Sequence, residues 1–344
     1  MTAPRADQAD LNIPIWGVEH PVQPHQEVWY LKLNGPDGRA LWIRYTLLVN
    51  QAGTRRIAET WAVAFERRPD GTVAKTAAKN TYPIDSFHIH PDNPAHFAIG
   101  ESSFSNDLVQ GQVRSEDHSI QWGFNTAPAT VLDFDFVPET LRRFGVVNNL
   151  AVTPREDLLF SGWAEVDGAR WEWQDAPGMQ GHLAGAKNGY AWAWAHCNLF
   201  TDEAGHAAPV IFDGLSARAR IKGNLATPHL STLFFRIGTE EYRLNTVWDT
   251  VRIRSKYTPA EWRFRARAAG AQFEGRVAAT LTDFAGVTYE DTDGSHLYCH
   301  NSKVSDMTLD VRRDGGSVER YHAAGTVAYE FVTRAPHPEV PFLL

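Results

Sequence analysis

The residues GMQGHLAGAKNGYAWAWAHCNLF, positions 178–200, decide the fold of this chain. From position 190 onward, large aromatic or polar residues alternate with small ones. Because successive side chains of a β-strand point to opposite faces, the pattern predicts a strand with one bulky face and one bare face. The bulky face takes Tyr190, Trp192, Trp194, His196 and Asn198, and the bare face takes Ala191, Ala193, Ala195 and Cys197. The bulky face suits the wall of a ligand cavity, whereas the alanines suit close packing against another layer.

Short alternating runs recur along the rest of the chain and are closed by turn residues. LWIRYTLL at 41–48, ETWAVAFE at 59–66 and EWRFRARA at 261–268 are such runs, and NGPDG at 34–38, VDG at 166–168 and TDG at 292–294 are such turns. The best helical candidate is the short segment PETLRRFGVV at 138–147. This spacing predicts an all-β chain of antiparallel barrels or sandwiches, and the length of 344 residues allows two of them.

Composition narrows the class of protein. Hydrophobic residues make up 43% and charged residues 22% of the chain, as in ordinary globular proteins, and the net charge of -8 argues against a nucleic-acid partner. Arg263, Arg265 and Arg267 alternate with apolar neighbours and indicate the solvent face of a strand. No apolar run approaches the roughly 20 residues of a transmembrane segment. With no visible export signal and only Cys197 and Cys299 as cysteines, we expect a cytoplasmic protein without disulfides.

Several ordered blocks carry a resemblance to a known family. They are FAIGESSFSNDLVQGQVRSEDHSIQWGFN at 97–125, FSGWAEVDGARWEWQDAPGMQGHLAG at 160–185, WAWAHCNLF at 192–200, YEDTDGSHLYCHNSK at 289–303 and GTVAYEFVTR at 325–334. In this order the chain resembles the tandem lipocalin-like superfamily of carotenoid 1,2-hydratases, AttH-type proteins, tocopherol cyclases and lipocalin-like Diels-Alderases. The resemblance implies two calycin-like β units, which we place at 1–210 and 211–344, and an apolar ligand cavity in or between them.

One block departs from the pattern of that family. Where its members have His-Asn-Trp-Gly, this chain has His182, Leu183, Ala184 and Gly185. The missing tryptophan puts any transferred pocket chemistry in doubt.

Hydration and cyclisation of a polyene begin with protonation of a double bond, which needs an acid kept dry by burial. His182, His196 and Asp175 are the candidate catalytic residues, although a histidine satisfied in the core and a turn carboxylate are the alternative interpretations. The candidate ligand-binding residues are Tyr190, Trp192, Trp194, Asn198, Trp122, Tyr298 and His300, and the aromatic ones could equally be core residues.

Metal and cofactor sites receive little support from the sequence. The pairs His196–Cys197 and Cys299–His300 supply the residue types of a zinc site, but neighbouring residues of a strand point to opposite faces and cannot easily chelate one ion. No glycine-rich phosphate loop follows a strand and opens a helix. We therefore expect neither a metal nor a nucleotide cofactor.

The sequence favours a cofactor-independent enzyme that hydrates, cyclises or isomerises an apolar small molecule such as a terpenoid, polyene or polyketide. A carrier or storage protein for an apolar ligand is the alternative, since it needs the same cavity. A partner-binding module without chemistry is a third interpretation. The sequence leaves the substrate and the oligomeric state open.

Overall fold

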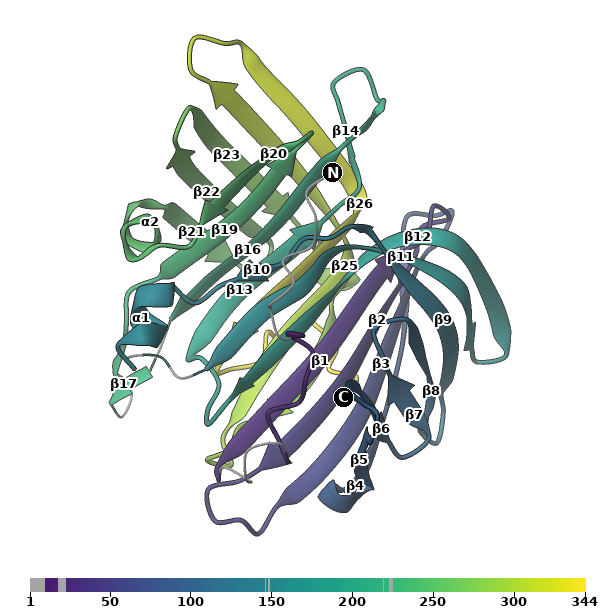
Figure 1. The fold of residues 1–344 in the computed structure, drawn as a ribbon. Helices are drawn as coiled ribbons and strands as arrows, with labels where there is room; N and C mark the ends of the chain where they lie inside the picture. The colour runs from purple at the N-terminus through teal and green to yellow at the C-terminus, as the bar shows by residue number, and fades with distance from the viewer. Residues whose placement is uncertain (1–9, 18–22, 146, 148, 219, 223–224) are drawn as a thin grey trace.

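The computed structural model describes residues 10–17, 23–145, 147, 149–218, 220–222 and 225–344, and these residues form two large antiparallel sheets (Figure 1). Helices are few and short: α1 (Glu139–Arg143), α2 (Val247–Arg252) and the 3-10 turns η1 (Ile84–Ser86) and η2 (Leu281–Asp283). The all-β class expected from the sequence is confirmed. Within the described residues, no helix combines the length and the apolar character needed to cross a membrane.

The first sheet is built from the chain up to Gly185. Its strand order is β4-β3-β2-β1-β12-β11-β9-β8-β7-β6-β5, with β10 paired to β11. The strands are β1 (His25–Asn34), β2 (Arg39–Val49), β3 (Arg56–Arg67), β4 (Val73–Pro83), β5 (Phe87–His90), β6 (Asn93–Ile99), β7 (Ser102–Phe104), β8 (Leu108–Arg114), β9 (Ser119–Thr130), β10 (Phe134–Asp135), β11 (Leu150–Val166) and β12 (Ala169–Gly185).

The second sheet is built from the remaining chain, in the order β20-β19-β16-β13-β26-β25-β23-β22-β21. Its strands are β13 (Ala191–Cys197), β16 (Val210–Arg218), β19 (Leu230–Ile237), β20 (Glu240–Leu244), β21 (Arg254–Thr258), β22 (Glu261–Ala268), β23 (Ala271–Ala278), β25 (His296–Arg313) and β26 (Val318–Thr333), with the side members β14 (Phe200–Thr201), β15 (Ala207–Ala208) and β24 (Ala285–Glu290). A separate pair joins β17 (Arg220–Lys222) to β18 (Leu225–Ala226).

The strands within residues 191–210 thus lie in the second sheet and not, as expected from the sequence, with the first unit at 1–210. The two sheets pack against each other through a common apolar cluster and are not separated by a linker without contacts. The division into units at 1–210 and 211–344 therefore stays a prediction.

Each sheet rolls up around its own apolar core. In the first sheet, Asn80 of β4 exchanges two 3.0 Å hydrogen bonds with the backbone of Arg114 on β8, which brings strands from distant places in the order together. In the second sheet, Ser255 of the edge strand β21 bonds Ser216 of β16 at 3.0 Å. Alternation along each strand fills the concave side with apolar residues and leaves the other side facing outward.

The outer faces of the two sheets pack against each other through a third apolar cluster. Val28, Tyr30 and Trp42 of the first sheet meet Trp194 and Ile211 of the second in this cluster. The interface also contains fully buried charged groups, among them Lys32 and Lys303. A buried charge is costly unless it is paired, so polar groups placed here need a structural or functional reason.

Candidate functional site

A cavity of about 200 Å³ lies between the outer faces of the two sheets. Strands β1, β2, β11 and β12 contribute from one side, and β13, β16, β24 and β26 from the other. Its apolar walls include Tyr30, Trp42, Phe136, Leu183, Trp192 and Trp194. A mostly apolar lining that combines aromatic rings with a few polar groups is typical of a small-molecule site.

Strand β13 forms part of this cavity as the alternation of its sequence predicts. Trp192 and Trp194 line the cavity, whereas Ala193, Ala195 and Cys197 belong to the core of the second sheet. The Trp194 indole N–H donates to Asp213 Oδ1 at 2.9 Å, which fixes the orientation of the ring. The alternation of faces at 192–197 is therefore that of the structure, but of the five residues predicted for the cavity wall only Trp192 and Trp194 line it.

Space for Tyr30, another wall residue, depends on Gly181 of the neighbouring strand β12. A Cβ atom at position 181 would lie 2.2 Å from Tyr30 Cζ, so any larger residue would displace the ring. The Tyr30 ring packs edge-on against Trp194, with 5.5 Å between the ring centroids. Glycine at this position therefore allows the wall to form.

Arg44 supplies a buried positive charge to the cavity. Its guanidinium carbon lies 4.0 Å from the centroid of the Tyr289 ring and 4.9 Å from that of Trp61. Neither Nε nor Nη1 has a hydrogen-bond partner within the described part of the chain. Both of these atoms are enclosed by neighbouring protein atoms, so a ligand oxygen would meet the guanidinium group where Arg44 lines the cavity. A guanidinium binds oxygen acceptors in a fixed planar geometry, and such a ligand would supply an acceptor that the protein does not.

Glu330 supplies a carboxylate to the same cavity. Lys303 Nζ donates to Glu330 Oε1 at 3.0 Å and to Asn301 Oδ1 at 2.5 Å, and the ammonium group lies 5.3 Å from the centroid of the Trp194 ring. Burial lowers the pKa of Lys303 from its ordinary value. Arg44 and Glu330 both line the cavity and form no ion pair with each other within the described residues. The second carboxylate oxygen of Glu330, Oε2, accepts from Cys299 Sγ at 3.7 Å.

A second buried acidic group lies next to the wall. Asp213 accepts from Thr153 Oγ1 at 2.6 Å as well as from Trp194, and burial raises its pKa to about 7. Burial and the neighbouring Asp213 raise the pKa of Glu156 well above its ordinary value. His196 Nε2 donates to the Glu156 backbone oxygen at 3.0 Å, and burial lowers the pKa of the imidazole. Burial thus favours the protonated form of Glu156 and the neutral form of His196, and both groups lie behind the wall, outside the cavity lining.

His182, the first candidate acid, lies on the opposite face of the first sheet from the cavity. Its ring stacks on Trp29 with 4.6 Å between centroids, Nδ1 donates to the Leu11 oxygen at 2.6 Å, and Nε2 donates to Glu27 Oε1 at 2.9 Å. Both ring nitrogens are satisfied and the side chain is fully buried. We infer a structural role for His182. Asp175, also a candidate, is exposed with φ 54° and bonds Ser161.

The other candidate ligand-binding residues are dispersed. Tyr190 lies beneath the guanidinium group of Arg218, and Trp122 is in the core of the first sheet. Asn198 donates to Asp157. Tyr298 packs edge-on against Phe342, and His300 Nδ1 donates to the Phe331 oxygen. None of these five belongs to the cavity lining found among the described residues.

Arg44, Glu330 and Lys303 are not among the site residues predicted from the sequence. A signal was present, because Arg44 in LWIRYTLL and Glu330 in VAYEFV are charged residues at bulky positions of otherwise apolar strands. Across the described ranges, no three His, Cys, Asp or Glu side chains gather into a group that could hold a metal ion. The expectation that function requires neither metal nor cofactor stays a prediction.

Solved structures share this fold at low sequence identity. An AttH-type protein from Nitrosomonas europaea has 11% identity and a TM-score of 0.54, over 90% of this chain and 93% of that one. CghA has 9% identity and a TM-score of 0.52, over 91% and 90%, and CghA with Sch210972 has 10% and 0.50 over the same shares. No protein-family profile matches the sequence, and no curated protein matches it either. The similarity confirms the tandem lipocalin-like fold and leaves the reaction open.

Proposed function

We propose that this protein is an enzyme that binds an apolar small molecule carrying a carbonyl or carboxylate group in the cavity between the sheets, and that it isomerises or cyclises this molecule. The observation that carries the proposal is the buried Arg44 guanidinium, which lines a mostly apolar cavity and lacks acceptors for two of its donors, together with Glu330 in the same lining. The likeness to AttH-type and Diels-Alderase folds is consistent with the proposal and does not supply it.

The charge on Arg44 determines which end of a ligand it holds. A buried cation without an acceptor loses the hydration that it has in water, and a ligand oxygen restores those interactions. The aromatic rings of Trp42, Trp192 and Trp194 then cover the hydrocarbon part of the ligand. The site thus binds an apolar body with one oxygen-bearing end.

The same two groups can carry out proton transfer. With a carbonyl oxygen bound by Arg44, Glu330 takes a proton from the neighbouring carbon, and the electron pair of that C–H bond moves toward the oxygen as an enolate. Arg44 stabilises the negative charge on that oxygen, and Lys303 compensates the charge on the Glu330 carboxylate before the transfer. Return of the proton to a different carbon gives an isomer with no net gain or loss of atoms.

Cyclisation requires fewer protein groups than isomerisation. Hydrogen bonds from Arg44 to a carbonyl withdraw electrons from a conjugated double bond, and the aromatic walls hold the two reacting ends close together. Of the reactions expected from the sequence, isomerisation and cyclisation need only these groups, whereas hydration also needs a bound water molecule. Glu330 acts in the isomerisation and only lines the site in the cyclisation.

The experiment pairs binding with product analysis. Polyene carboxylic acids, polyene ketones and the matching hydrocarbons are titrated into the protein, and tryptophan fluorescence reports binding. Arg44→Met should weaken binding of the oxygenated compounds by about tenfold to a hundredfold and leave the hydrocarbons unaffected. Arg114→Met, on the exposed surface of the first sheet, is the matched control.

Products are identified by chromatography and nuclear magnetic resonance, because an isomer has the mass of its substrate. Glu330→Gln should retain ligand binding and reduce isomerisation by about a hundredfold or more. Compounds recovered unchanged from a saturated wild-type protein would identify a carrier in place of an enzyme. Equal affinity of wild type and Arg44→Met for the oxygenated compounds would remove the basis of the proposal.

A further inference from the structure

The described surface carries apolar side chains next to a concentration of basic ones on the same side of the molecule. Trp248 and Val251 of α2 are 70% and 62% exposed, and Phe144, directly after α1, is 77% exposed. Large apolar residues at such exposure, gathered close together, mark a surface that binds something.

The two short helices are held together by a set of hydrogen bonds. Asn245, two residues before α2, donates its side-chain N–H to the Asp135 oxygen at 2.8 Å, and Arg142 of α1 donates to both Asp135 carboxylate oxygens at 2.9 Å. Figure 1 shows α1 and α2 on the same side of the molecule. Trp248 and Phe144 therefore project from neighbouring elements.

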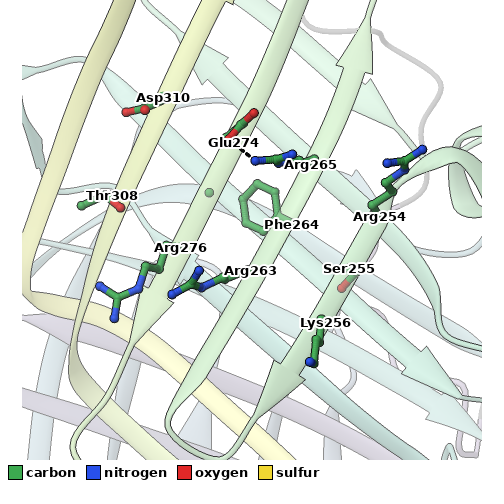
Figure 2. Close-up of a pocket in the computed structure, with 11 residues that line it drawn as sticks. Arg254, Ser255, Lys256, Arg263, Phe264, Arg265, Glu274, Arg276, Thr308 and Asp310 are labelled. Carbon is green, nitrogen blue, oxygen red and sulfur yellow. Dashed lines mark ion pairs between the residues drawn. The ribbon is translucent and has the colours of Figure 1, made fainter.

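Basic residues continue this surface onto the second sheet. Residues 247–276 contain seven basic and three acidic side chains, a net charge of +4 in a chain whose total is -8. Figure 2 shows basic side chains from the adjacent strands β21, β22 and β23 on one face. Arg252 of α2 lines a common depression with Arg254, Arg265 and Arg267, so the helix and the strand face are continuous.

The charges on this surface are not all neutralised by the protein. Arg265 pairs with Glu274 at 3.2 Å, and Arg263 pairs with Glu261. Arg254 and Arg267 are exposed and form no ion pair within the described residues. The outer face of β22 thus presents positive charge to an external anion.

We propose that α1, α2 and the outer face of β21–β23, here called the helix–strand face, dock on an anionic lipid membrane. Tryptophan and other large apolar side chains enter the boundary between headgroups and acyl chains, while basic residues are attracted to anionic headgroups. Both kinds of residue lie together on this face. A nucleic acid would use the arginines but would leave Val251 and Phe144 in water, so the combination favours a membrane.

The cavity has lining residues on both sides of α1 in the sequence, so the helix–strand face lies next to it. α1 lies between Phe136 and Asn149, which both line the cavity, and Arg142 donates to the Asn149 oxygen at 3.2 Å. An apolar ligand dissolved in a bilayer would therefore reach the cavity from the side on which the protein docks. Membrane docking itself does not depend on the proposed reaction, because it is measured without any substrate.

Flotation of the full-length protein with vesicles tests the proposal. Wild type should float with vesicles of phosphatidylcholine and phosphatidylglycerol, less at high salt, and little with phosphatidylcholine alone. Arg254→Glu/Arg267→Glu should lower the partition coefficient by at least about tenfold. The double variant Arg68→Glu/Arg114→Glu changes the same charge on the first sheet and should retain binding. Trp248→Ala should also bind less.

Thermal unfolding of each variant shows that loss of binding is not loss of fold. Equal flotation of wild type and Arg254→Glu/Arg267→Glu would overturn the proposal, as would flotation that Trp248→Ala leaves unchanged. Failure to float together with salt-sensitive binding of duplex DNA by the same arginines would identify a nucleic-acid surface in its place. Arg44→Met and Glu330→Gln should still float with anionic vesicles, because membrane docking does not use the cavity. Flotation without any turnover would therefore support docking while contradicting the proposed reaction.

Discussion

Glu27 provides the sharpest test of how the first sheet is closed by the segment that precedes it. Its carboxylate accepts four hydrogen bonds: from the backbone N–H groups of Ile15 and Trp16 at 2.7 and 2.9 Å, and from His25 and His182 at 2.9 Å each. Burial alone would raise the pKa of Glu27, but these hydrogen bonds outweigh it and lower the pKa from 4.5 to about 2. The folded state therefore stabilises the ionised form of the Glu27 carboxylate.

The magnitude follows from linkage between protonation and folding. A carboxyl group with a lower pKa in the folded state contributes stability above its unfolded pKa, and this contribution is lost as the pH falls toward the folded pKa. A shift of this size corresponds to about 3 kcal/mol above pH 5, decreasing to about 2 kcal/mol near pH 3.5. Glu27→Gln should therefore destabilise the protein by about 3 kcal/mol at neutral pH, with a smaller difference in acid.

Urea unfolding of wild type and Glu27→Gln at several pH values between neutral and the acid limit of the fold measures this difference. Glu116→Gln, at an exposed position, is the control and should match wild type throughout. A difference between wild type and Glu27→Gln that stays constant with pH would refute the reasoning, because it would mean that the charge of the carboxylate contributes nothing.

Further outcomes follow from the cores and the interface between the sheets. Ala195→Leu should destabilise the protein by about 1–3 kcal/mol through overpacking of the second core, measured by urea unfolding. Gly181→Ala should displace the Tyr30 ring and weaken the binding of any cavity ligand, measured by tryptophan fluorescence, in a protein that still unfolds cooperatively. Unchanged affinity would contradict this. Burial raises the pKa values of Glu156 and Asp213, so their protonated forms stabilise the fold in acid, and this stability should be lost as the pH rises from about 4 through the folded pKa, about 7 for Asp213. Glu156→Gln should reduce that loss in urea titrations across this range, and an unaltered pH profile would contradict a raised pKa of Glu156.

The sequence predicted the features of this fold that depend on local pattern. The alternation around Trp192 and Trp194 depends only on neighbours along one strand, and the two faces of residues 192–197 are those of the structure, although the predicted wall was longer than the part that lines the cavity. The turns at VDG and TDG likewise depend on residues within the turn, such as Asp167, which has φ 49°. Local conformation and side-chain direction are encoded over a few residues, so they can be read without tertiary information.

The polar part of the candidate site could not be predicted in this way. Arg44 and Glu330 are far apart in the sequence, and only the packing of the two outer faces brings them to one cavity. For His182 the missing information was the position of Glu27 and of the Leu11 backbone, which bind both ring nitrogens on the other side of the sheet. A histidine with two partners from distant segments cannot be distinguished by local pattern from one that faces a ligand.

The location of the cavity determines how its capacity can change. Barrels of the lipocalin kind hold a ligand inside the barrel, where the number and tilt of the strands set the diameter. Here both concave sides are filled by apolar cores, and the space lies between the backs of the sheets. The size of the molecule that fits is therefore set by the distance and angle at which two independently packed layers meet. Substitutions of residues such as Leu215 or Phe136 at that junction can alter ligand choice while each core retains its own packing.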